Sequence, residues 1–454
     1  MAAGAVLGAA RPQYGGTLRV EIEPAVASVD PAAMAADSVQ EAARVRISTL
    51  VFESLTAIDA DGLEPLLATS WQSDARGSRW RFRLRSGVVL HDRTTLETWQ
   101  AAAALRATEP AWKVIADGDT IAIDTPEPAP DLPWVVADAR HAIVVRGAGG
   151  ALIGSGPFRL DHVDPSQVIV KAHEPYWHAR PFVDAVQIDT GRRPDAQVGD
   201  LESGRADLAS LRATDARRLT RRGLRVEASR PIELVALVFE PHRADDASAG
   251  WRRTLAATIN RDAIAAVVLQ GWAVPARSLL PDWVSGYARA LGGVDGRMLS
   301  ASEVGALPSD RRSVLLRVDP ADAVAQAIGD RLAVDAREAG FSIRLQAPVG
   351  LAPRADARLV RVAVPATTPD RALPQAIARL MLRGWSPAAL PANSPLDATL
   401  RAEQALLDGA VIVPIVHLPE LYGLGERVGL STLPAARPTG GWNVADLWLQ
   451  ANRP

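Results

Sequence analysis

The sequence predicts an α/β protein built from more than one lobe. The chain has 454 residues, which is too long for one ordinary core. Strand-like segments of period two recur in the first half, and strand and helix patterns alternate in the second half. Such alternation is typical of lobes with a parallel sheet. We therefore expect at least two α/β lobes.

The composition is that of a folded protein whose acidic and basic residues nearly balance. Hydrophobic residues make up 48% and charged residues 22% of the chain, and the formal net charge is -2. This balance gives no electrostatic footprint for nucleic acid, so we expect no nucleic-acid partner. The absence of cysteine excludes disulfides, thiolate metal sites, a cysteine nucleophile and a lipid-anchoring cysteine.

The amino terminus resembles the end of a secretory signal peptide. Residues 1–10 are small and apolar and end in Gly8-Ala9-Ala10, although the positive region that begins such peptides is missing. We expect residues 1–13 to be the remnant of a truncated signal peptide. A floppy Ala/Gly terminus is the alternative. No later run reaches the roughly 20 apolar residues of a membrane span.

Elements of the first half follow from periodicity and capping. Residues 17–22 and 80–85 alternate apolar and polar side chains, which predicts half-buried strands. Thr94 followed by Glu97 predicts a capping box that starts a helix through about Leu105. Further strands are expected at 121–123, 168–170 and 186–188, and a short helix, a turn and a strand start over 201–211.

The second half predicts a βαβ unit between other helices. Residues 253–270 have helical apolar spacing, with Asn260 as an internal N-cap and Gly271 as the end. Asp319-Pro320 is expected to cap a helix that Gly340 closes. Strands at 314–316 and 342–346 flank that helix, so we expect them to be parallel. Another strand, a capped helix and a last strand are expected at 359–364, from Ser394-Pro395 onward and at 411–413.

In this order, the segments resemble the family 5 extracellular solute-binding proteins, the peptide and nickel binders of bacterial importers. The resemblance extends from about Tyr14 to Leu449, and no single block carries it alone. The similar blocks are LVFESL at 50–55, LLATSW at 66–71, WRFRLRSGVVLH at 80–91, GSGPF at 154–158, YW at 176–177, RPFVD at 180–184, LESGRAD at 201–207 and the helix at 252–264 with Gly271.

The resemblance implies a two-lobed periplasmic-binding-protein fold, type II-like, with a small subdomain inserted in lobe I. Lobe I would comprise residues 14–50, 153–235 and 418–454, the subdomain 51–152, and lobe II 236–417. The implied function is the periplasmic solute-binding component of an ABC importer, which closes about a hinge on a peptide-like or other small polar solute and delivers it to permease subunits. A monomer is expected. The alternatives are a ligand-sensing module that reports to a partner protein, and a hydrolase.

Two departures from the family leave the solute open. Phe239-Glu240 stands where the family commonly has Phe-Asn, so a carboxylate replaces an amide. Residues 362–370 lack the tryptophan- and aspartate-containing pattern that anchors the amino terminus of a peptide in the peptide binders. A free peptide as the ligand is therefore in doubt.

Six residues are candidates for ligand contact because they are expected near lobe edges or the hinge. For the aromatic members, a place in the core is the alternative, and for Asp30 it is turn formation. A buried Glu240 at the crossover between lobes would favour a cationic or amine-bearing ligand. The candidates are Asp30, Phe239, Glu240, Trp385, Tyr422 and Trp442.

The chain shows no pattern that predicts catalysis, a metal site or a cofactor. Its seven histidines include no pair with the i, i+4 spacing and glutamate of a zinc hydrolase. The GSG at 154–156 lacks both the spacing of a nucleophile elbow and the Lys-Ser/Thr end of a phosphate-binding loop. We therefore expect a binding protein and no enzyme.

Overall fold

The chain forms two compact units in the structure, which is a computed structural model. One unit comprises Met1–Ser229 and Leu421–Pro454, and the other comprises Arg230–Glu420. The chain thus crosses between them twice. The expected boundaries at 235/236 and 417/418 both fall inside the second unit, because the strands there belong to its sheet. The residues described are 12–34, 38–59, 62–243, 249–285, 299–320, 322–346, 354–364, 372–373, 376–377, 379–380, 396–429 and 442–450.

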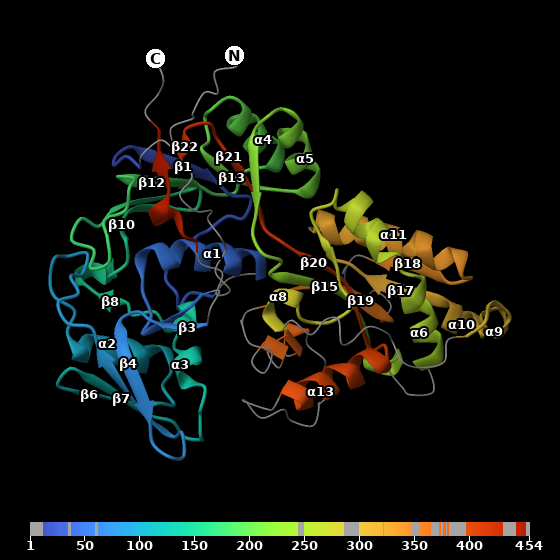
Figure 1. Ribbon diagram of the computed structural model, residues 1–454, viewed down its shortest axis with the longest axis horizontal. Helices are drawn as coiled ribbons and strands as arrows, with labels where there is room; N and C mark the ends of the chain where they lie inside the picture. The colour runs from blue at the N-terminus through green and yellow to red at the C-terminus, as the bar shows by residue number, and fades with distance from the viewer. Residues whose placement is uncertain are drawn as a thin grey trace, which may run out of the picture. The chain divides into compact units, whose positions relative to one another are not determined.

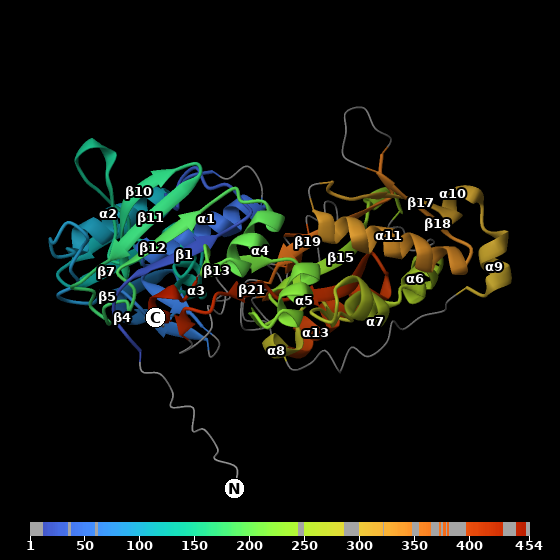
Figure 2. The same ribbon diagram turned by 90° about the horizontal axis from the view of Figure 1, so that it is seen from above.

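A seven-stranded mixed sheet forms the centre of the first unit, and its strands lie side by side in Figure 2. In spatial order they are β10 (Phe158–Asp164), β11 (Gln167–Ala172), β12 (Ala185–Asp189), β1 (Thr17–Glu21), β13 (Leu208–Leu211), β21 (Leu421–Leu424) and β14 (Arg225–Ala228). β12, β1 and β13 run parallel, and the other pairings are antiparallel. The strands expected at 17–22, 168–170 and 186–188 are all confirmed.

Helices cover both faces of this sheet (Figure 1). Helix α1 (Ser38–Val51) packs on the face that carries Leu18 and Val20 of β1 and Ile22 directly after it, each almost fully buried. Helices α4 (Pro194–Glu202) and α5 (Ala213–Arg221) pack with β13 on the other face. The alternation of β1 therefore separates an apolar face under α1 from a polar face under α4. A short pair, β22 (Val428–Gly429) and β23 (Trp448–Leu449), completes this part.

The inserted segment forms an antiparallel sheet in the order β4, β5, β7, β6, with its own apolar core. The side chains of Trp80, Phe82 and Leu84 are buried on β5, as the alternation predicts. The expected cap of the following helix is wrong by three residues. Its N-cap is Glu97, whose backbone N–H donates to Gln100 Oε1 at 2.8 Å, because the side chain of Thr94 is bonded to Asp92 instead.

The elements of the inserted segment are short. They are β2 (Thr56–Ile58), β3 (Leu63–Pro65), β4 (Ala68–Ser73), β5 (Arg79–Leu84), α2 (Thr98–Thr108), β6 (Lys113–Asp117), β7 (Thr120–Asp124), α3 (Leu132–Val135), β8 (Val145–Arg146) and β9 (Leu152–Ile153). Helix α2 packs against β6 and β7, and the opposite face of the sheet carries the exposed arginines of β5.

The GSG segment at 154–156 is a close backbone contact and not a ligand loop. A Cβ on Gly154 would lie 2.1 Å from the carbonyl oxygen of Val51, and one on Gly156 would lie 2.8 Å from it. The N–H of Gly156 donates to the same oxygen at 3.0 Å. Only glycine allows the returning chain to run this close to the end of α1.

A buried carboxylate joins the inserted segment to the main sheet. Glu53 is 4% exposed and accepts hydrogen bonds from Ser155 Oγ at 2.7 Å, Tyr176 Oη at 2.8 Å and Trp177 Nε1 at 3.1 Å. Burial raises the pKa of Glu53, and these three donors oppose the rise. The guanidinium of Arg85 lies 4.0 Å from the ring centre of Trp177. One side chain therefore connects three separate segments of the chain.

The second unit is built on a six-stranded mixed sheet. In spatial order its strands are β16 (Val274–Pro275), β20 (Ile412–Leu418), β15 (Glu233–Phe239), β19 (Ala357–Ala363), β17 (Ser313–Arg317) and β18 (Ser342–Gln346). β17 pairs in parallel with both β18 and β19, which confirms the expected βαβ unit. The other neighbours are antiparallel.

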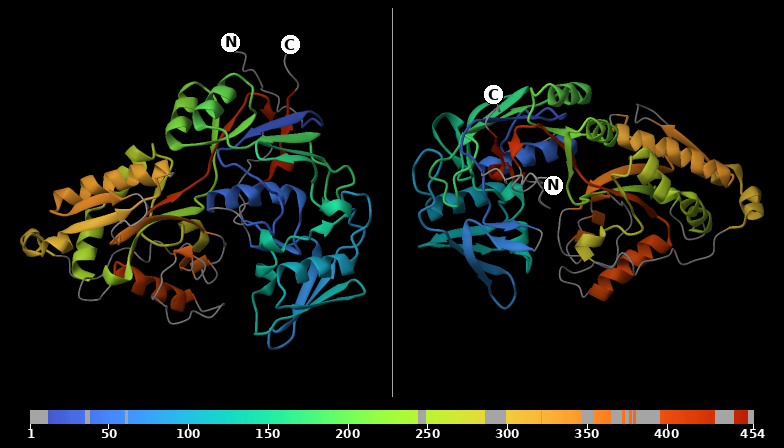
Figure 3. Two further views of the ribbon diagram at one scale, coloured as in Figure 1. Left: turned by 180° about the vertical axis from the view of Figure 1, so that it is seen from behind. Right: turned by 45° about the horizontal axis from the view of Figure 1, so that its top comes forward.

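Helices cover both faces of this second sheet (Figure 3). The helices α6, α9 and α11 and the π-helical turn pack on one face. The helices α8 and α13 pack on the other face. Asn260 caps a new helical turn, as expected. The helices are α6 (Ala249–Thr258), α7 (Arg261–Ala263), a π-helical turn (Ile264–Val268), α8 (Asp282–Ser285), α9 (Ala301–Ala306), α10 (Ser309–Arg312), α11 (Ala323–Glu338) and α13 (Leu396–Asp408).

The cap predicted for the βαβ helix is also displaced. Asp322, and not Asp319, accepts hydrogen bonds from the N–H groups of Val324 and Ala325, both at 3.0 Å. Asp319 accepts from the N–H of Asp322 through its carbonyl, which makes a turn before the helix. Two aspartates three residues apart compete for the role, and the second wins because its side chain reaches both free N–H groups.

We expect Glu53→Ala to lower the free energy of unfolding by about 3 kcal/mol, because it removes the acceptor of three hydrogen bonds. Tyr176→Phe removes one donor and should cost about 1 kcal/mol. Urea unfolding of the intact chain measures both. Glu127→Ala, at an exposed position of the same segment, serves as the control and should change stability by no more than about 0.5 kcal/mol. Equal effects of Glu53→Ala and Glu127→Ala would contradict the role of the buried carboxylate.

Candidate functional site

In the first unit the chain crossings leave from the carboxyl edge of the parallel strands. Glu21 at the end of β1 pairs in register with Asp189 at the end of β12. Leu211 at the end of β13 pairs with Leu421, which also pairs with Ala228 at the end of β14. Residues 228 and 421 flank the two crossings. Ligands of open α/β sheets bind outside the carboxyl ends of strands, so this edge is the candidate site of the first unit.

The second unit has the same arrangement. The parallel strands β17, β18 and β19 run toward the edge at which β15 begins and β20 ends. Glu233, the first residue of β15, pairs with Ala363 on one side and with Leu418 on the other. The crossings lie within three residues of Glu233 and Leu418. This edge is the candidate site of the second unit.

A buried carboxyl group lies at the first edge. Glu21 is 5% exposed, and its Oε1 lies 3.5 Å from Arg192 Nε. Arg192 donates to Asp200 of α4 at 2.5 Å, and Arg205 Nε donates to the other oxygen of Asp200 at 2.7 Å. Each oxygen of Asp200 therefore accepts from a guanidinium group, that of Arg192 or that of Arg205. Glu21 has only the longer contact with Arg192, a guanidinium that Asp200 also binds.

The environment of Glu21 brings its titration into the neutral range. Burial raises the pKa of Glu21 to about 7, and the hydrogen bond and negative charge of Asp200 add to the rise, while Arg192 opposes it. Two carboxyl groups that share a site do not both ionise easily. The first edge therefore holds a group that changes charge near pH 7.

Asp30 lies in the loop between β1 and α1. Its Oδ2 accepts from Arg146 Nη2 at 2.7 Å, and its carbonyl accepts from Arg44 at 2.8 Å. Its Oδ1 accepts from the N–H of Ala32 at 3.0 Å. This bond is the turn-forming role that was the alternative to ligand contact. The Asp30 carboxylate has a partner in the structure, and its contact with a ligand stays a prediction.

The second edge carries a charged cluster on β15, β19 and the start of α11. Arg361 Nη2 pairs with Glu233 Oε2 at 2.5 Å, and its Nη1 lies 3.8 Å from Asp322 Oδ2. The arginine side chain is 36% exposed, and the two acids are less so. One guanidinium between two carboxylates therefore marks this edge.

The expected location of Phe239 and Glu240 at the crossover is wrong. β15 starts next to the crossing and ends at Phe239, so the pair lies about 20 Å along the strand from it. Phe239 is 2% exposed and packs edge to face on Trp251, with ring centres 5.3 Å apart. Glu240 Oε1 lies 3.3 Å from Arg358 Nε. The charge of Glu240 is paired at the end of the sheet that is remote from the crossings.

The two remaining described candidates are core residues of the first unit. Tyr422 is 2% and Trp442 is 5% exposed, and Trp442 Nε1 donates to Tyr422 Oη at 3.0 Å. Both belong to the apolar core under α1. A place in the core was the alternative to ligand contact for these aromatic residues. Trp385 and most of the segment 362–370 lie outside the described residues. Ligand contact by these three aromatic residues stays a prediction.

Sequence reasoning missed Glu21, Glu233 and Arg361. Each lies in or at the end of a strand whose apolar residues are easy to recognise. The usable signal was a charged residue at the terminus of a buried strand. Glu21 ends the pattern TLRVE, and Glu233 begins ELVALVF.

The described residues contain no group of three or more His, Asp or Glu side chains that could hold a metal ion. Within the same residues, no helix has both the length and the apolar character needed to cross a membrane.

Comparison with known proteins identifies relatives of the chain. The family model "Bacterial extracellular solute-binding proteins, family 5 Middle" matches residues 62–347. HTH-type transcriptional regulator SgrR of Salmonella choleraesuis is 28% identical over 157 residues, which are 31% of this chain and 28% of SgrR. The chain thus spans less than a third of the length of the curated relatives it matches.

Solved structures of the same fold cover nearly the whole chain. The substrate-binding protein CtaP of Listeria monocytogenes has a TM-score of 0.78 and 16% identity, covering 97% of this chain and 100% of CtaP. NikA of Brucella suis, in complex with Fe(III)-EDTA, has a TM-score of 0.77 and 17% identity, covering 96% of this chain and 100% of NikA. At these identities the likeness establishes the two-lobed fold.

We expect the stability contributed by Glu21 to fall as the pH rises from about 5 to about 8. The pKa of Glu21 is raised in the folded protein, so the folded state holds its proton more tightly than the unfolded state. That contribution is complete below the ordinary pKa and is lost as the pH passes about 7. Glu21→Gln stays neutral and should be more stable than the parent chain at pH 8, with little difference at pH 5.

Thermal unfolding at both pH values measures this difference. Glu23→Gln is the control, because Glu23 lies at the same edge but is exposed and paired with Arg212. If Glu21→Gln and the parent chain lose stability equally between pH 5 and pH 8, then Glu21 is not the group that titrates.

Proposed function

The chain belongs to family 5 of the bacterial extracellular solute-binding proteins, and on this basis we propose that it is the solute-binding component of an ABC importer. It captures a peptide-like or other small polar solute outside the cytoplasmic membrane and delivers it to permease subunits. The proteins of known name that it resembles are binding and regulatory proteins. We infer that it catalyses no reaction.

One observation carries the proposal. In each unit, both crossings leave from the carboxyl edge of the sheet, and charged side chains gather at that edge. A protein that binds and releases a solute needs residues of both units to contribute to affinity, since only differential contact shifts an equilibrium between conformations. Two short crossings are suited to act as the hinge of such a movement.

The chemistry of the two edges favours a polar, charge-bearing solute. Glu21 and Arg192 mark the first edge, and Arg361 with Glu233 marks the second. Arginine binds carboxylates through a planar fork, and carboxylates accept from amines. NikA, which has this fold, was solved with the chelate Fe(III)-EDTA. Micromolar affinity requires only about 8 kcal/mol.

A second function, a ligand-sensing module that reports to a partner protein, is favoured by one comparison. The chain is similar to part of SgrR, a transcriptional regulator. A sensor and an importer component both bind a solute, so ligand binding alone does not separate them. Stimulation of a permease ATPase by the liganded chain would identify the importer component.

A thermal-shift screen with short peptides, amines, sugars and metal chelates should identify at least one solute that stabilises the chain. At a hundred times its dissociation constant, a solute adds about 2.7 kcal/mol to the free energy of unfolding. Arg361→Gln should weaken the binding of that solute about tenfold or more, because it removes a charged hydrogen-bond donor. Isothermal titration calorimetry measures the change.

Arg401→Gln is the control for that experiment, because it removes an exposed arginine of α13 in the same unit. Its affinity should match that of the parent chain. A screen in which no importer-type solute shifts the unfolding temperature would overturn the proposed function. A solute that binds Arg361→Gln as tightly as the parent chain would remove the second edge from the site.

A further inference from the structure

At the carboxyl edge of the first sheet, one partly exposed arginine serves two acids. Arg192 donates through Nη2 to Asp200 at 2.5 Å, and its Nε lies 3.5 Å from Glu21 Oε1. The side chain of Arg192 is 40% exposed, whereas that of Glu21 is 6% exposed. The Nη1 of Arg192 makes no hydrogen bond with the described residues. A solute at this edge therefore meets the guanidinium group before it meets the carboxyl group of Glu21.

Glu21 depends on Arg192 more than Asp200 does. Arg205 Nε also donates to Asp200, at 2.7 Å, so Asp200 keeps one guanidinium if Arg192 moves. The other charged groups that face Glu21 in the described part of the chain are the carboxylates of Asp200 on α4 and Asp189 on β12, and β13 meets it with an alanine. Loss of Arg192 would therefore leave an ionised Glu21 buried beside two negative charges.

A proton can take the place of the missing guanidinium. Ionised Glu21 has one buried oxygen, Oε2, that accepts no hydrogen bond from the described residues. Protonated Glu21 is uncharged and can donate a hydrogen bond to Asp200. Burial and Asp200 already raise the pKa of Glu21 to about 7, and Arg192 opposes this rise. Withdrawal of Arg192 therefore favours the protonated form.

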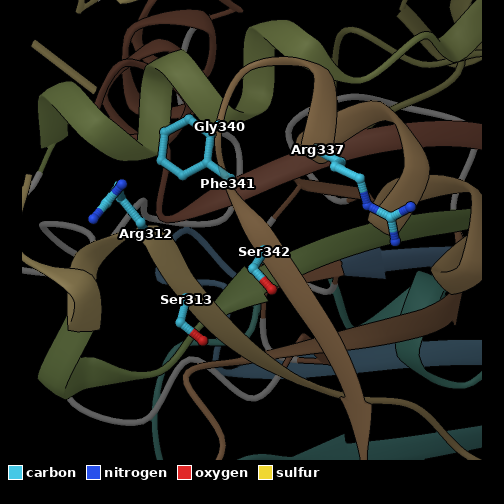
Figure 4. A pocket seen from close by; sticks show the side chains of 6 residues that line it. All are labelled: Arg312, Ser313, Arg337, Gly340, Phe341 and Ser342. Atoms are coloured by element: carbon cyan, nitrogen blue, oxygen red, sulfur yellow. The ribbon is translucent and has the colours of Figure 1, made fainter. Parts of the chain in front are cut away.

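The hollow at the amino edge of β17 and β18 shows arginines that lack such a common target. There the guanidinium groups of Arg312 and Arg337 point away from each other and from the hydroxyl groups of Ser313 and Ser342 (Figure 4). These groups do not converge on one ligand. At the first edge, by contrast, two guanidinium groups converge on the carboxylate of Asp200.

We propose that the first edge binds a carboxylate group of the solute through Arg192, and that this binding draws a proton onto the pair formed by Glu21 and Asp200. This coupling rests on the proposed solute binding and adds the class of the bound group and its dependence on pH. The solute carboxylate pairs with the guanidinium of Arg192, which then supports Glu21 less. One proton from the solvent converts the Glu21 carboxylate to the acid, so it balances the negative charge that the solute group brings.

N-acetyl-trialanine is the probe, because it has one carboxylate and no group that titrates between pH 5 and pH 8. Isothermal titration calorimetry of the intact chain at pH 7, in HEPES and in Tris, counts the protons taken up, since these buffers differ in ionisation enthalpy. We expect an uptake of up to about half a proton. If bound Glu21 titrates near pH 8, the affinity should be about fivefold higher at pH 6 than at pH 8. The uncharged N-acetyl-trialanine amide should bind about tenfold more weakly and without proton uptake.

Three variants assign the effect to residues. Glu21→Gln cannot take up the proton, so its affinity for the probe should be equal at pH 6 and pH 8. Arg192→Gln should weaken binding about tenfold and abolish the uptake. Arg193→Gln is the matched control and should behave as the parent chain, because the Arg193 side chain is 82% exposed and pairs with Asp195. Should Arg192→Gln fail to fold, Glu21→Gln decides the question.

Binding of the probe without proton uptake overturns the coupling, as does an uptake that Glu21→Gln retains. Absence of binding up to about 20 mM overturns it as well, because a carboxylate subsite should then hold the probe detectably. The proposed function fails separately, when the wider screen of peptides, amines, sugars and metal chelates finds no solute that stabilises the chain.

Discussion

The antiparallel pairing of β15 with β20 is the constraint from which the candidate site follows. Residues 234, 236 and 238 of β15 lie in one core and 235, 237 and 239 in the other, all nearly fully buried. A strand buried on both faces cannot slip by one residue without exchanging its two faces. The points at which the chain enters and leaves the second unit are therefore fixed at one edge of its sheet, and the charged residues of that edge are fixed with them.

In the first unit, about a hundred residues are inserted between the first helix and the strands that complete the sheet. The two ends of this insertion must be held together. Glu53 holds the two ends of the insertion together through donors from the returning segment. The two glycines beside it allow the backbones to approach. A buried acid with three donors is a demanding arrangement, since loss of the acid removes the acceptor of all three hydrogen bonds. It ties the insertion to the edge of the sheet at which β10 begins and β11 ends, opposite to the edge that carries Glu21.

Periodicity predicted the elements well, and single side-chain contacts were predicted poorly. The period-two strand at β5 and the parallel βαβ pair follow from where apolar residues repeat, which is local information. The cap at Asn260 was predicted correctly, whereas those at Thr94 and Asp319 were wrong because competing residues lie nearby and backbone geometry decides which of them caps the helix. Glu240 was misplaced because a strand pattern does not say which end lies next to the crossing. Glu21 was missed because its burial and its neighbour Asp200, which together raise its pKa, depend on segments distant in sequence.

The ion pairs at the two edges bear on the kind of solute that can bind. Glu233 and Arg361 are paired with each other at the second edge, as are Glu21 and Arg192 at the first. A singly charged solute that takes one partner leaves the other without its counter-ion, which costs free energy where the group is partly buried. A solute with both an acidic and a basic group can replace both partners at once. Under the proposed function, paired edges therefore favour zwitterionic solutes, which include peptides, over simple anions or cations.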